Sequence, residues 1–240
     1  MKVQEASKIT PLTAIGIDLG IKTLAHTSND QIIDNPKYLT QSEKKLAKAQ
    51  QEVSRKQRGS NNRGKAKAKV RKIHRKIANQ RKNNLHQISC QITNDNDLIC
   101  METLNVKGMM ANHCLAKAIG QIGWGMLKQY ILYKAKLKGK TVVQIDRFAP
   151  SSKTCCGCGC IKDNLTLGDR TFKCEHCGLV IDRDLNAAIN ILMMGYKDYC
   201  KNTVGTTGIY ACGGVNISDP ISYRAFIETL NQETQPFRNE

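Results

Sequence analysis

The sequence of 240 residues is poor in aromatic side chains and in acids, and it contains no long apolar run. Aromatic residues make up only 5% of the chain, and hydrophobic residues 40%, somewhat less than in an ordinary globular domain. No window approaches the ~18 uninterrupted apolar residues that a membrane-spanning helix needs. The N-terminus also lacks the apolar core of a secretory signal peptide. We therefore expect a cytoplasmic protein that does not bind membranes.

A disulfide framework is not expected either. The chain has eleven cysteines, and without a secretion signal these indicate a reducing compartment and metal binding. Four of them form two C-x-x-C pairs separated by fifteen residues, Cys155 with Cys158 and Cys174 with Cys177. This spacing predicts a four-thiolate zinc ribbon. A glycine follows each pair, as expected where the chain turns back tightly with a positive φ.

We expect one structural zinc ion in this ribbon, because four thiolates fill a tetrahedral shell and leave no open position for catalysis. Zinc binding contributes on the order of 10 kcal/mol to the folding of small zinc modules. The ligand register stays open, since Cys156 or Cys160 could replace a neighbouring cysteine. The remaining cysteines are interpreted as packing residues: Cys90, Cys100, Cys114, Cys200 and Cys212.

Positive charge is concentrated in one segment of the chain. Residues 41–85 carry sixteen Lys and Arg against two acids, and so account for 14 of the 17 net positive charges. A field of this size is typical of a surface that binds a polyanion, although most charge runs are merely solvated helix faces. We expect nucleic acid here. The candidate contacts are Lys22, Arg55, Lys56, Arg58, Arg63, Lys65, Lys67, Lys69, Arg71, Lys72, Arg75 and Lys76.

The apolar pattern predicts an α/β protein. Strands are expected at residues 14–19, 24–27, 31–33, 97–102 and 140–145. Helices are expected at residues 42–57, after a break at 58–64 up to about 92, at 115–137 and at 185–194. This order is that of an RNase H-like fold with two insertions, a basic helical hairpin and the four-cysteine zinc ribbon. By itself the fold says little about function.

The predicted division of the chain follows these elements. It comprises residues 1–40 (strands one to three), 41–93 (the hairpin), 94–150 (the second part of the nuclease fold), 151–181 (the ribbon), 182–214 (the third part) and 215–240 (a flexible tail).

Three acids stand where these elements begin or end. Asp18 lies near the end of the first strand, Glu102 ends the fourth, and Asp184 opens the last helix. In an RNase H-like fold these positions converge, and clustered carboxylates are costly unless a cation lies between them. Oxygen ligands suit Mg²⁺ or Mn²⁺. Two such ions ~4 Å apart can hydrolyse a phosphodiester.

Each acid also has a purely structural interpretation. An Asp at a strand end often forms a turn, and either Asp182 or Asp184 could cap the last helix. Asp182 remains an alternative to Asp184 as the third ligand, because only two positions separate them. We prefer Asp184 because Asn186 and Ala187 follow it in the helix.

Taken together, these residues resemble the OrfB/TnpB proteins of bacterial insertion sequences, relatives of the compact type V CRISPR nucleases. The resemblance covers about residues 14–213 in the same order. It is carried by Gly16-Ile17-Asp18-Leu19-Gly20, Glu102-Thr103-Leu104-Asn105-Val106-Lys107-Gly108-Met109, Ser151-Ser152-Lys153-Thr154-Cys155, the cysteine pairs and Asp182-Arg183-Asp184-Leu185-Asn186-Ala187-Ala188, with Tyr133-Lys134-Ala135 and Gly205-Thr206-Thr207-Gly208 as further matches.

The resemblance implies a RuvC-type nuclease whose metal-binding triad is Asp18, Glu102 and Asp184. Members of this family use a guide RNA, transcribed from the end of the element, to direct double-strand DNA cleavage. The basic hairpin would then lie against the RNA–DNA heteroduplex and read its shape and backbone charge. DNA and guide RNA are thus the expected partners, and the bacterial nucleoid the expected location.

The chain departs from the family pattern in three places. Its first acid is already at position 18, so that the usual N-terminal lobe for guide and target recognition is missing. We expect either an N-terminally truncated member of the family or a chain whose start is assigned too far downstream. Thr103 stands where the family often has an acid. Gln121 stands where an Asp before the Gly-Trp pair is usual.

Three functions follow from this pattern. The first is a transposon-encoded, metal-dependent DNA endonuclease with a two-metal mechanism. The second is a catalytically idle nucleic-acid-binding remnant or repressor-like module. The third is a cut-and-paste transposase with a DDE-type site, which is disfavoured because the last acid of that class is a Glu and here it is Asp184.

Overall fold

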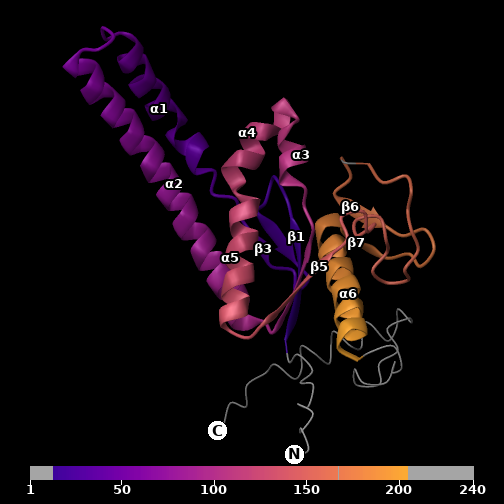
Figure 1. The fold of residues 1–240 in the computed structure, drawn as a ribbon. Helices are drawn as coiled ribbons and strands as arrows, with labels where there is room; N and C mark the ends of the chain where they lie inside the picture. The colour runs from indigo at the N-terminus through magenta and orange to yellow at the C-terminus, as the bar shows by residue number, and fades with distance from the viewer. Residues whose placement is uncertain (1–12, 167, 205–240) are drawn as a thin grey trace, which may run out of the picture.

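The structure is a computed structural model that describes residues 13–166 and 168–204. Its elements in these ranges are labelled in Figure 1. The strands are β1 (Ala14–Leu19), β2 (Ala25–Thr27), β3 (Ile32–Ile33), β4 (Leu98–Glu102), β5 (Thr141–Ile145), β6 (Thr171–Lys173) and β7 (Val180–Asp182). The helices are α1 (Tyr38–Ser54), α2 (Asn61–Asp95), α3 (Val106–Met110), α4 (His113–Ile122), α5 (Trp124–Leu137) and α6 (Arg183–Val204).

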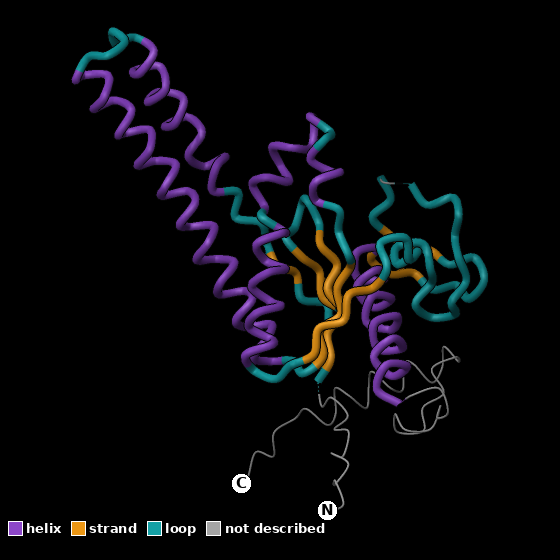
Figure 2. Tube along the Cα trace, viewed as in Figure 1, coloured by secondary structure: helices purple, strands orange, loops and turns teal. Residues whose placement is uncertain are grey.

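A five-stranded mixed sheet forms the centre of the chain, in the order β3-β2-β1-β4-β5. Strand β1 pairs antiparallel with β2 and parallel with β4, and β4 pairs parallel with β5. Helices α2 and α5 lie on one side of this sheet and α6 on the other (Figures 1 and 2). The predicted mixed α/β class is therefore confirmed.

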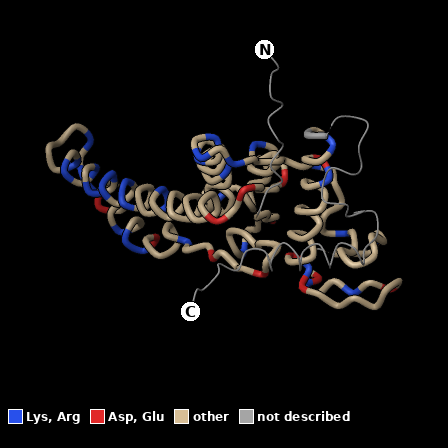
Figure 3. Tube along the Cα trace, turned by 90° about the horizontal axis from the view of Figure 1, so that it is seen from below, with Lys and Arg blue, Asp and Glu red and all other residues tan. Residues whose placement is uncertain are grey.

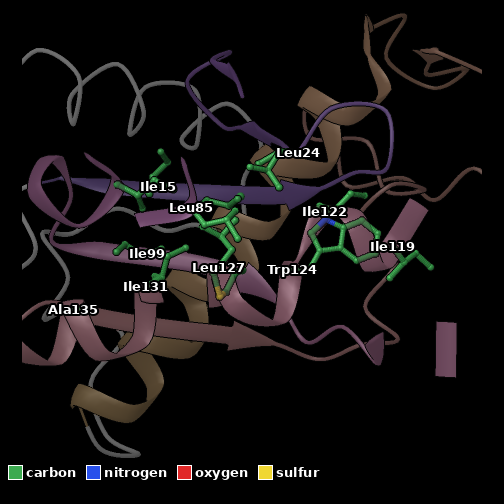
Figure 4. Close-up of a cluster of buried hydrophobic side chains, with 14 residues drawn as sticks. Ile15, Leu24, Leu85, Ile99, Ile119, Ile122, Trp124, Leu127, Ile131 and Ala135 are labelled. Atoms are coloured by element: carbon green, nitrogen blue, oxygen red, sulfur yellow. The ribbon is translucent and has the colours of Figure 1, made fainter. Parts of the chain in front are cut away.

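Successive side chains along β1 and β4 point to opposite faces of the sheet. The side chains of Ile15, Ile17, Ile99 and Met101 belong to a buried cluster with residues of α2, α4 and α5, part of which Figure 4 shows. The intervening Leu98 and Cys100 pack instead against α6. Residues 18 and 102 continue this second set, so their side chains point to the α6 face.

Helix α6 lies unusually close to the sheet. A Cβ atom added to Gly16 of β1 would overlap the carbonyl oxygen of Ala188 and lie 2.8 Å from Leu192 Cβ. On the opposite side of the same contact, a Cβ added to Gly195 of α6 would overlap the thiol of Cys100 on β4. Glycine at these two positions therefore lets the helix backbone approach both central strands.

Helices α1 and α2 form a hairpin that projects from the sheet (Figure 1). The side chain of Ser60 begins α2 by accepting the N–H of Arg63 at 3.2 Å. The C-terminal part of α2 packs against α5, where the ring of His86 stacks on Tyr130 with centroids 4.0 Å apart. The base of the hairpin is thus part of the core, and its far end extends beyond it.

All the predicted helices have different bounds in the structure. The two hairpin helices differ by a few residues, because α1 ends at Ser54 and α2 already begins at Asn61, inside the break predicted at 58–64. The other two differ more. The single helix expected at 115–137 is wrong: Gly123, with a φ of 80°, ends α4 and begins α5. This left-handed residue changes the direction of the chain, and the apolar periodicity on either side of it does not reveal the change. The last helix was expected at 185–194 but continues to Val204.

Some predictions lie outside the described residues, namely the tail at 215–240, the end of the 182–214 segment, Cys212 and the Gly205–Gly208 match. Within the described ranges, no helix combines the length and apolar character needed to cross a membrane.

Candidate active site and four-cysteine cluster

The three acids predicted as a triad line a single groove. Its volume is about 1000 Å³, and Asp18, Glu102 and Asp184 all contribute to its wall. Two of them come together through strand register, because Ile17 of β1 is paired with Met101 of β4 and the next residue on each strand is an acid. The third comes from the first turn of α6, which packs across both strands.

Electrostatics indicate that the three carboxylates affect one another. The pKa of Asp18 is raised to about 7, chiefly by burial and then by the neighbouring charges of Glu102 and Asp184, while Arg183 opposes the shift. Burial and nearby like charges both disfavour the ionised carboxylate. A cation bound between the carboxylates would offset their mutual repulsion.

Asp182 and Asp184 have different environments. Asp182 Oδ1 accepts the backbone N–H groups of Asp184 at 2.9 Å and Leu185 at 3.1 Å, so it caps α6. It also lies 3.7 Å from Nδ1 of the buried His26. Asp184 instead faces the groove and pairs with Arg183 at 3.3 Å and with Arg170 at 3.8 Å.

Sequence reasoning missed His26, which is paired with Asp18 across β1 and β2. Its Nε2 lies 3.1 Å from Asp30 Oδ1. One ligand atom each of His26, Asp182 and Asp184 lie within 4.8 Å of one another. A lone His on a three-residue strand gives no signal of this position in the sequence.

Basic side chains surround the acids in the groove. They are Lys22, Lys37, Lys117, Lys153, Arg170 and Arg183. Only Lys22 was predicted to contact nucleic acid; the others come from separate segments and belong to no charge run. An acidic centre with a cationic rim is suited to a phosphate backbone, since the rim attracts the phosphates and the centre can hold metal.

The other eleven predicted contacts lie on the hairpin, where Lys and Arg are dense (Figure 3). They are exposed except for Arg63, which is half-buried and donates from Nη1 to the carbonyl of Lys56 at 3.0 Å. Lys69 pairs with Glu52 at 3.0 Å. None of the eleven lines the groove, so the hairpin forms a separate positive surface.

The two C-x-x-C pairs form one cluster of thiols. The Sγ atoms of Cys155, Cys158, Cys174 and Cys177 all lie within 4.8 Å of one another, with the 155–177 pair at 3.6 Å and the 158–174 pair at 3.5 Å. Tetrahedral Zn–S bonds of about 2.3 Å would place the sulfurs about 3.8 Å apart, which these distances fit.

The loops around the cluster have the geometry of metal-binding turns. Gly159 and Gly178, which follow the two cysteine pairs, have φ of 73° and 75°, as their sequence positions predict. Their N–H groups donate to the carbonyls of Cys155 at 2.9 Å and Cys174 at 3.1 Å. Among the described residues, the only potential ligand group that contains Cys160 is the one with Cys158 and His176, whose ligand atoms lie within 4.8 Å of one another. The geometry therefore favours the register with Cys155 and Cys158.

Sequence reasoning also missed a polar contact between this module and the acids. The hydroxyl of Ser151 donates to Glu102 Oε1, while Asn186 and Asn190 of α6 hold the backbone of the same segment. Ser151, Asn186 and the Thr154 carbonyl lie in the Ser-Ser-Lys-Thr-Cys and Asp-Leu-Asn-Ala-Ala segments that carry the family resemblance. Their presence in these segments was the sequence signal that could have indicated the contact.

Two family descriptions match the chain. Residues 1–113 match the family described as "Probable transposase", and residues 124–191 match "Cas12f1-like, TNB domain". Together they cover both the segment that supplies Asp18 and Glu102 and the segment that holds the cysteine cluster and Asp184.

Curated relatives agree with these matches. A "Putative RNA-guided DNA endonuclease" of Streptomyces pristinaespiralis is 42% identical over 76% of this chain and 45% of its own length. The "Putative RNA-guided DNA endonuclease InsQ" of Escherichia coli K12 is 29% identical over 82% of this chain and 54% of its own. The chain thus spans about half the length of these relatives.

A solved structure supports the fold. The cryo-EM structure of a Cas12f1-sgRNA-target DNA complex contains a chain that superposes with a TM-score of 0.55 at 20% identity, covering 78% of this chain and 51% of that one. This structure supports the fold alone, while the two family matches and the curated relatives show that the chain is similar to OrfB/TnpB proteins over most of its length.

Proposed function

We propose that this chain is the nuclease part of a TnpB-type, metal-dependent DNA endonuclease with a RuvC (RNase H-like) active site. The observation that carries the proposal is the convergence of Asp18, Glu102 and Asp184 in one groove with a cationic rim. A protein that only bound nucleic acid would gain nothing from three carboxylates facing a phosphate backbone, because they repel it.

The carboxylates would hold the catalytic metal. Their donor atoms are all oxygens, which Mg²⁺ and Mn²⁺ prefer. The pKa of Asp18 is raised mainly by burial and also by the charges of Glu102 and Asp184, and a cation would neutralise those charges. When bound, two such ions supply the Lewis acidity that activates water and stabilises the leaving oxygen in phosphodiester hydrolysis.

The residues of the chain would do the rest by binding and orientation. Lys22, Lys117 and Lys153 can hold phosphates on either side of the scissile bond. Arg183 and Arg170 neutralise Asp184 while the metal is absent. Asp18 must lose its proton to bind a cation, and a pKa of about 7 allows this at neutral pH.

The four-cysteine cluster fits a single structural zinc ion held by Cys155, Cys158, Cys174 and Cys177. Four thiolates complete its coordination, so this metal would stabilise the fold and not take part in hydrolysis.

DNA and a guide RNA are the proposed partners. Two curated relatives are named as RNA-guided DNA endonucleases. The basic hairpin α1–α2 is long and carries many Lys and Arg (Figure 3), and its predicted contact residues lie outside the groove, as expected of a surface for the backbone of a heteroduplex. Acting on DNA would place the chain at the bacterial nucleoid.

The test is a cleavage assay on labelled single-stranded DNA with Mg²⁺ or Mn²⁺. We expect nicking by the wild type, loss of nicking on EDTA addition, and at least a 100-fold loss for Asp18→Ala with unchanged zinc content. Equal cleavage by the two proteins after parallel purification would reject the assignment.

A second candidate is a nucleic-acid-binding module without turnover. One observation favours it: Asp184 is paired with both Arg183 and Arg170, an arrangement that satisfies this acid without metal. Both functions predict binding that weakens steeply with salt, so only the turnover assay distinguishes them.

A further inference from the structure

The carboxylate of Glu102 is held by a side chain from the cysteine-rich segment. The hydroxyl of Ser151 donates to Glu102 Oε1, and Ser151 is only 5% exposed. A hydroxyl has one hydrogen to donate, so this bond holds one oxygen of Glu102 and leaves Oε2 without a bond from Ser151. The bond therefore restrains the carboxylate of Glu102, a residue that lines the groove.

Ser151 is itself held by α6, the helix that carries Asp184. Asn190 Nδ2 donates to the Ser151 carbonyl at 2.7 Å and to the Thr154 carbonyl at 2.6 Å. One turn earlier on the helix, Asn186 Nδ2 donates to the same Thr154 carbonyl at 2.7 Å. The backbone between Ser151 and Thr154 is thus tied to α6 at both ends.

The hydrogen bonds of α6 with this segment extend to the first cysteine pair. Asn186 Oδ1 accepts the N–H of Cys156 at 2.9 Å, and Cys156 lies next to Cys155, a thiol of the cluster. Asn186 and Asn190 are both buried, where an unmatched amide or carbonyl would be costly. The segment can therefore not shift at the cysteines without breaking buried hydrogen bonds near Ser151.

From this chain of contacts we propose that Ser151 is a positioning residue for Glu102, and that the buried asparagine clamp couples metal occupancy of the four-cysteine cluster to the geometry of the carboxylate site. The cysteine module then does more than stabilise itself: an empty cluster loosens the clamp, releases Ser151 and lets Glu102 leave its cation-binding rotamer. This inference rests on the proposed metal site at Asp18, Glu102 and Asp184.

The first test measures Mn²⁺ affinity by electron paramagnetic resonance on the zinc-loaded full chain. Ser151→Ala is expected to weaken Mn²⁺ binding by about 10- to 100-fold, the usual effect of removing a hydrogen-bond partner of a metal ligand. Ser151→Thr keeps the hydroxyl and is expected to restore most of the affinity. Ser54 is exposed, lies at the end of α1 and does not line the groove; it supplies the control Ser54→Ala, for which Mn²⁺ affinity should be unchanged.

The second test asks whether the cluster acts through Ser151. Cys177 is the exposed ligand of the cluster, and Cys177→Ser is expected to lower zinc content and Mn²⁺ affinity together. Because coupled residues give non-additive effects, the Ser151→Ala/Cys177→Ser double variant should bind Mn²⁺ about as weakly as the weaker single variant.

The outcomes separate the two proposals. Absence of Mn²⁺ binding that depends on Asp18 in the wild type overturns the proposed function and this inference with it. Wild-type affinity in Ser151→Ala, with Asp18-dependent binding present in the wild type, overturns only the positioning role. If the fold losses of Mn²⁺ affinity in the two single variants multiply in the double variant, the coupling through Ser151 is overturned. The Ser151→Ala arm needs no disruption of the cluster, so it decides the positioning role even if Cys177→Ser does not fold.

Discussion

Asp18 and Glu102 leave the adjacent parallel strands β1 and β4 at the same level and on the same face of the sheet. The register that pairs Ile17 with Met101 fixes this relationship, and it makes the charge of Glu102 one cause of the raised pKa of Asp18. Two like charges in this position are unfavourable without a cation between them. Four predictions about this site, the cysteine cluster and the hairpin can be measured directly.

Gly16→Ala should displace α6 and so separate Asp184 from the other two acids. The added methyl group would overlap the Ala188 carbonyl oxygen, which is backbone and has no room to move aside alone. We expect a loss of about 1–3 kcal/mol in the free energy of unfolding, measured by urea denaturation, together with loss of Mn²⁺ binding. Gly64→Ala is the matched control: its Cβ meets no atom within 4 Å, and in a helix the change should stabilise by up to ~1 kcal/mol. Equal effects of the two substitutions would refute the role of close helix packing.

The stability of the chain without Mg²⁺ should depend on pH through Asp18. Its pKa is about 7 in the folded chain and 3.8 without the perturbing environment, so the folded state binds the proton more tightly. Stability should fall as pH rises from about 4 to 7 and then level off, by at most about 4 kcal/mol. Urea denaturation at several pH values should show this fall in the wild type and a much smaller one in Asp18→Asn. A wild-type curve parallel to that of Asp18→Asn would contradict the predicted shift.

Cys155→Ser should remove zinc and unfold the cysteine module. Cys155 is buried and its thiol lies 3.6 Å from that of Cys177, so its loss removes one of the four thiols of the cluster. We expect one zinc ion per chain in the wild type and less than a tenth of that in the variant, measured by elemental analysis. The interpretation of Cys114 as a packing residue is wrong, because this residue is exposed; it also lies outside the cluster, and Cys114→Ser should retain the full zinc content. Loss of zinc in both variants, or in neither, would argue against the assigned ligands.

Nucleic-acid affinity should depend on those hairpin cations that form no ion pair with another of the described residues. Arg71→Ala and Lys72→Ala are each expected to weaken binding to an RNA–DNA heteroduplex and to reduce the slope of log affinity against log salt by about 1 per lost phosphate contact. Lys69→Ala should have a smaller effect, because Lys69 is paired with Glu52. Fluorescence anisotropy at several salt concentrations measures both quantities. A larger effect of Lys69→Ala than of the other two would show that the hairpin does not bind in this way.

The positions of Asp18 and Glu102 were predictable because the apolar pattern of each strand agrees with the order of the elements along the chain. Each acid lies at or near the C-terminal end of a short apolar strand, and the order of the elements places those strands side by side. The distinction between Asp182 and Asp184 was less predictable, since it depends on which of them accepts the N–H groups at the start of α6. That choice is made by the local backbone geometry.

The rest of the site depends on contacts between segments that are far apart in the sequence. Lys117 and Arg170 join the groove from α4 and from the cysteine-rich module, and neither belongs to a charge run. The bond from Ser151 to Glu102 spans 49 positions. The break between α4 and α5 depends on the backbone conformation of Gly123, which a glycine in an apolar helix pattern does not reveal.

The central claim is that Asp18, Glu102 and Asp184 bind catalytic metal together, and its most direct test is anomalous scattering from crystals of the full chain soaked in Mn²⁺. The account predicts anomalous density within coordination distance of a carboxylate oxygen of each of the three residues, and its disappearance in Asp18→Ala. Density confined to His26 and Asp182, or none in the groove, would contradict it.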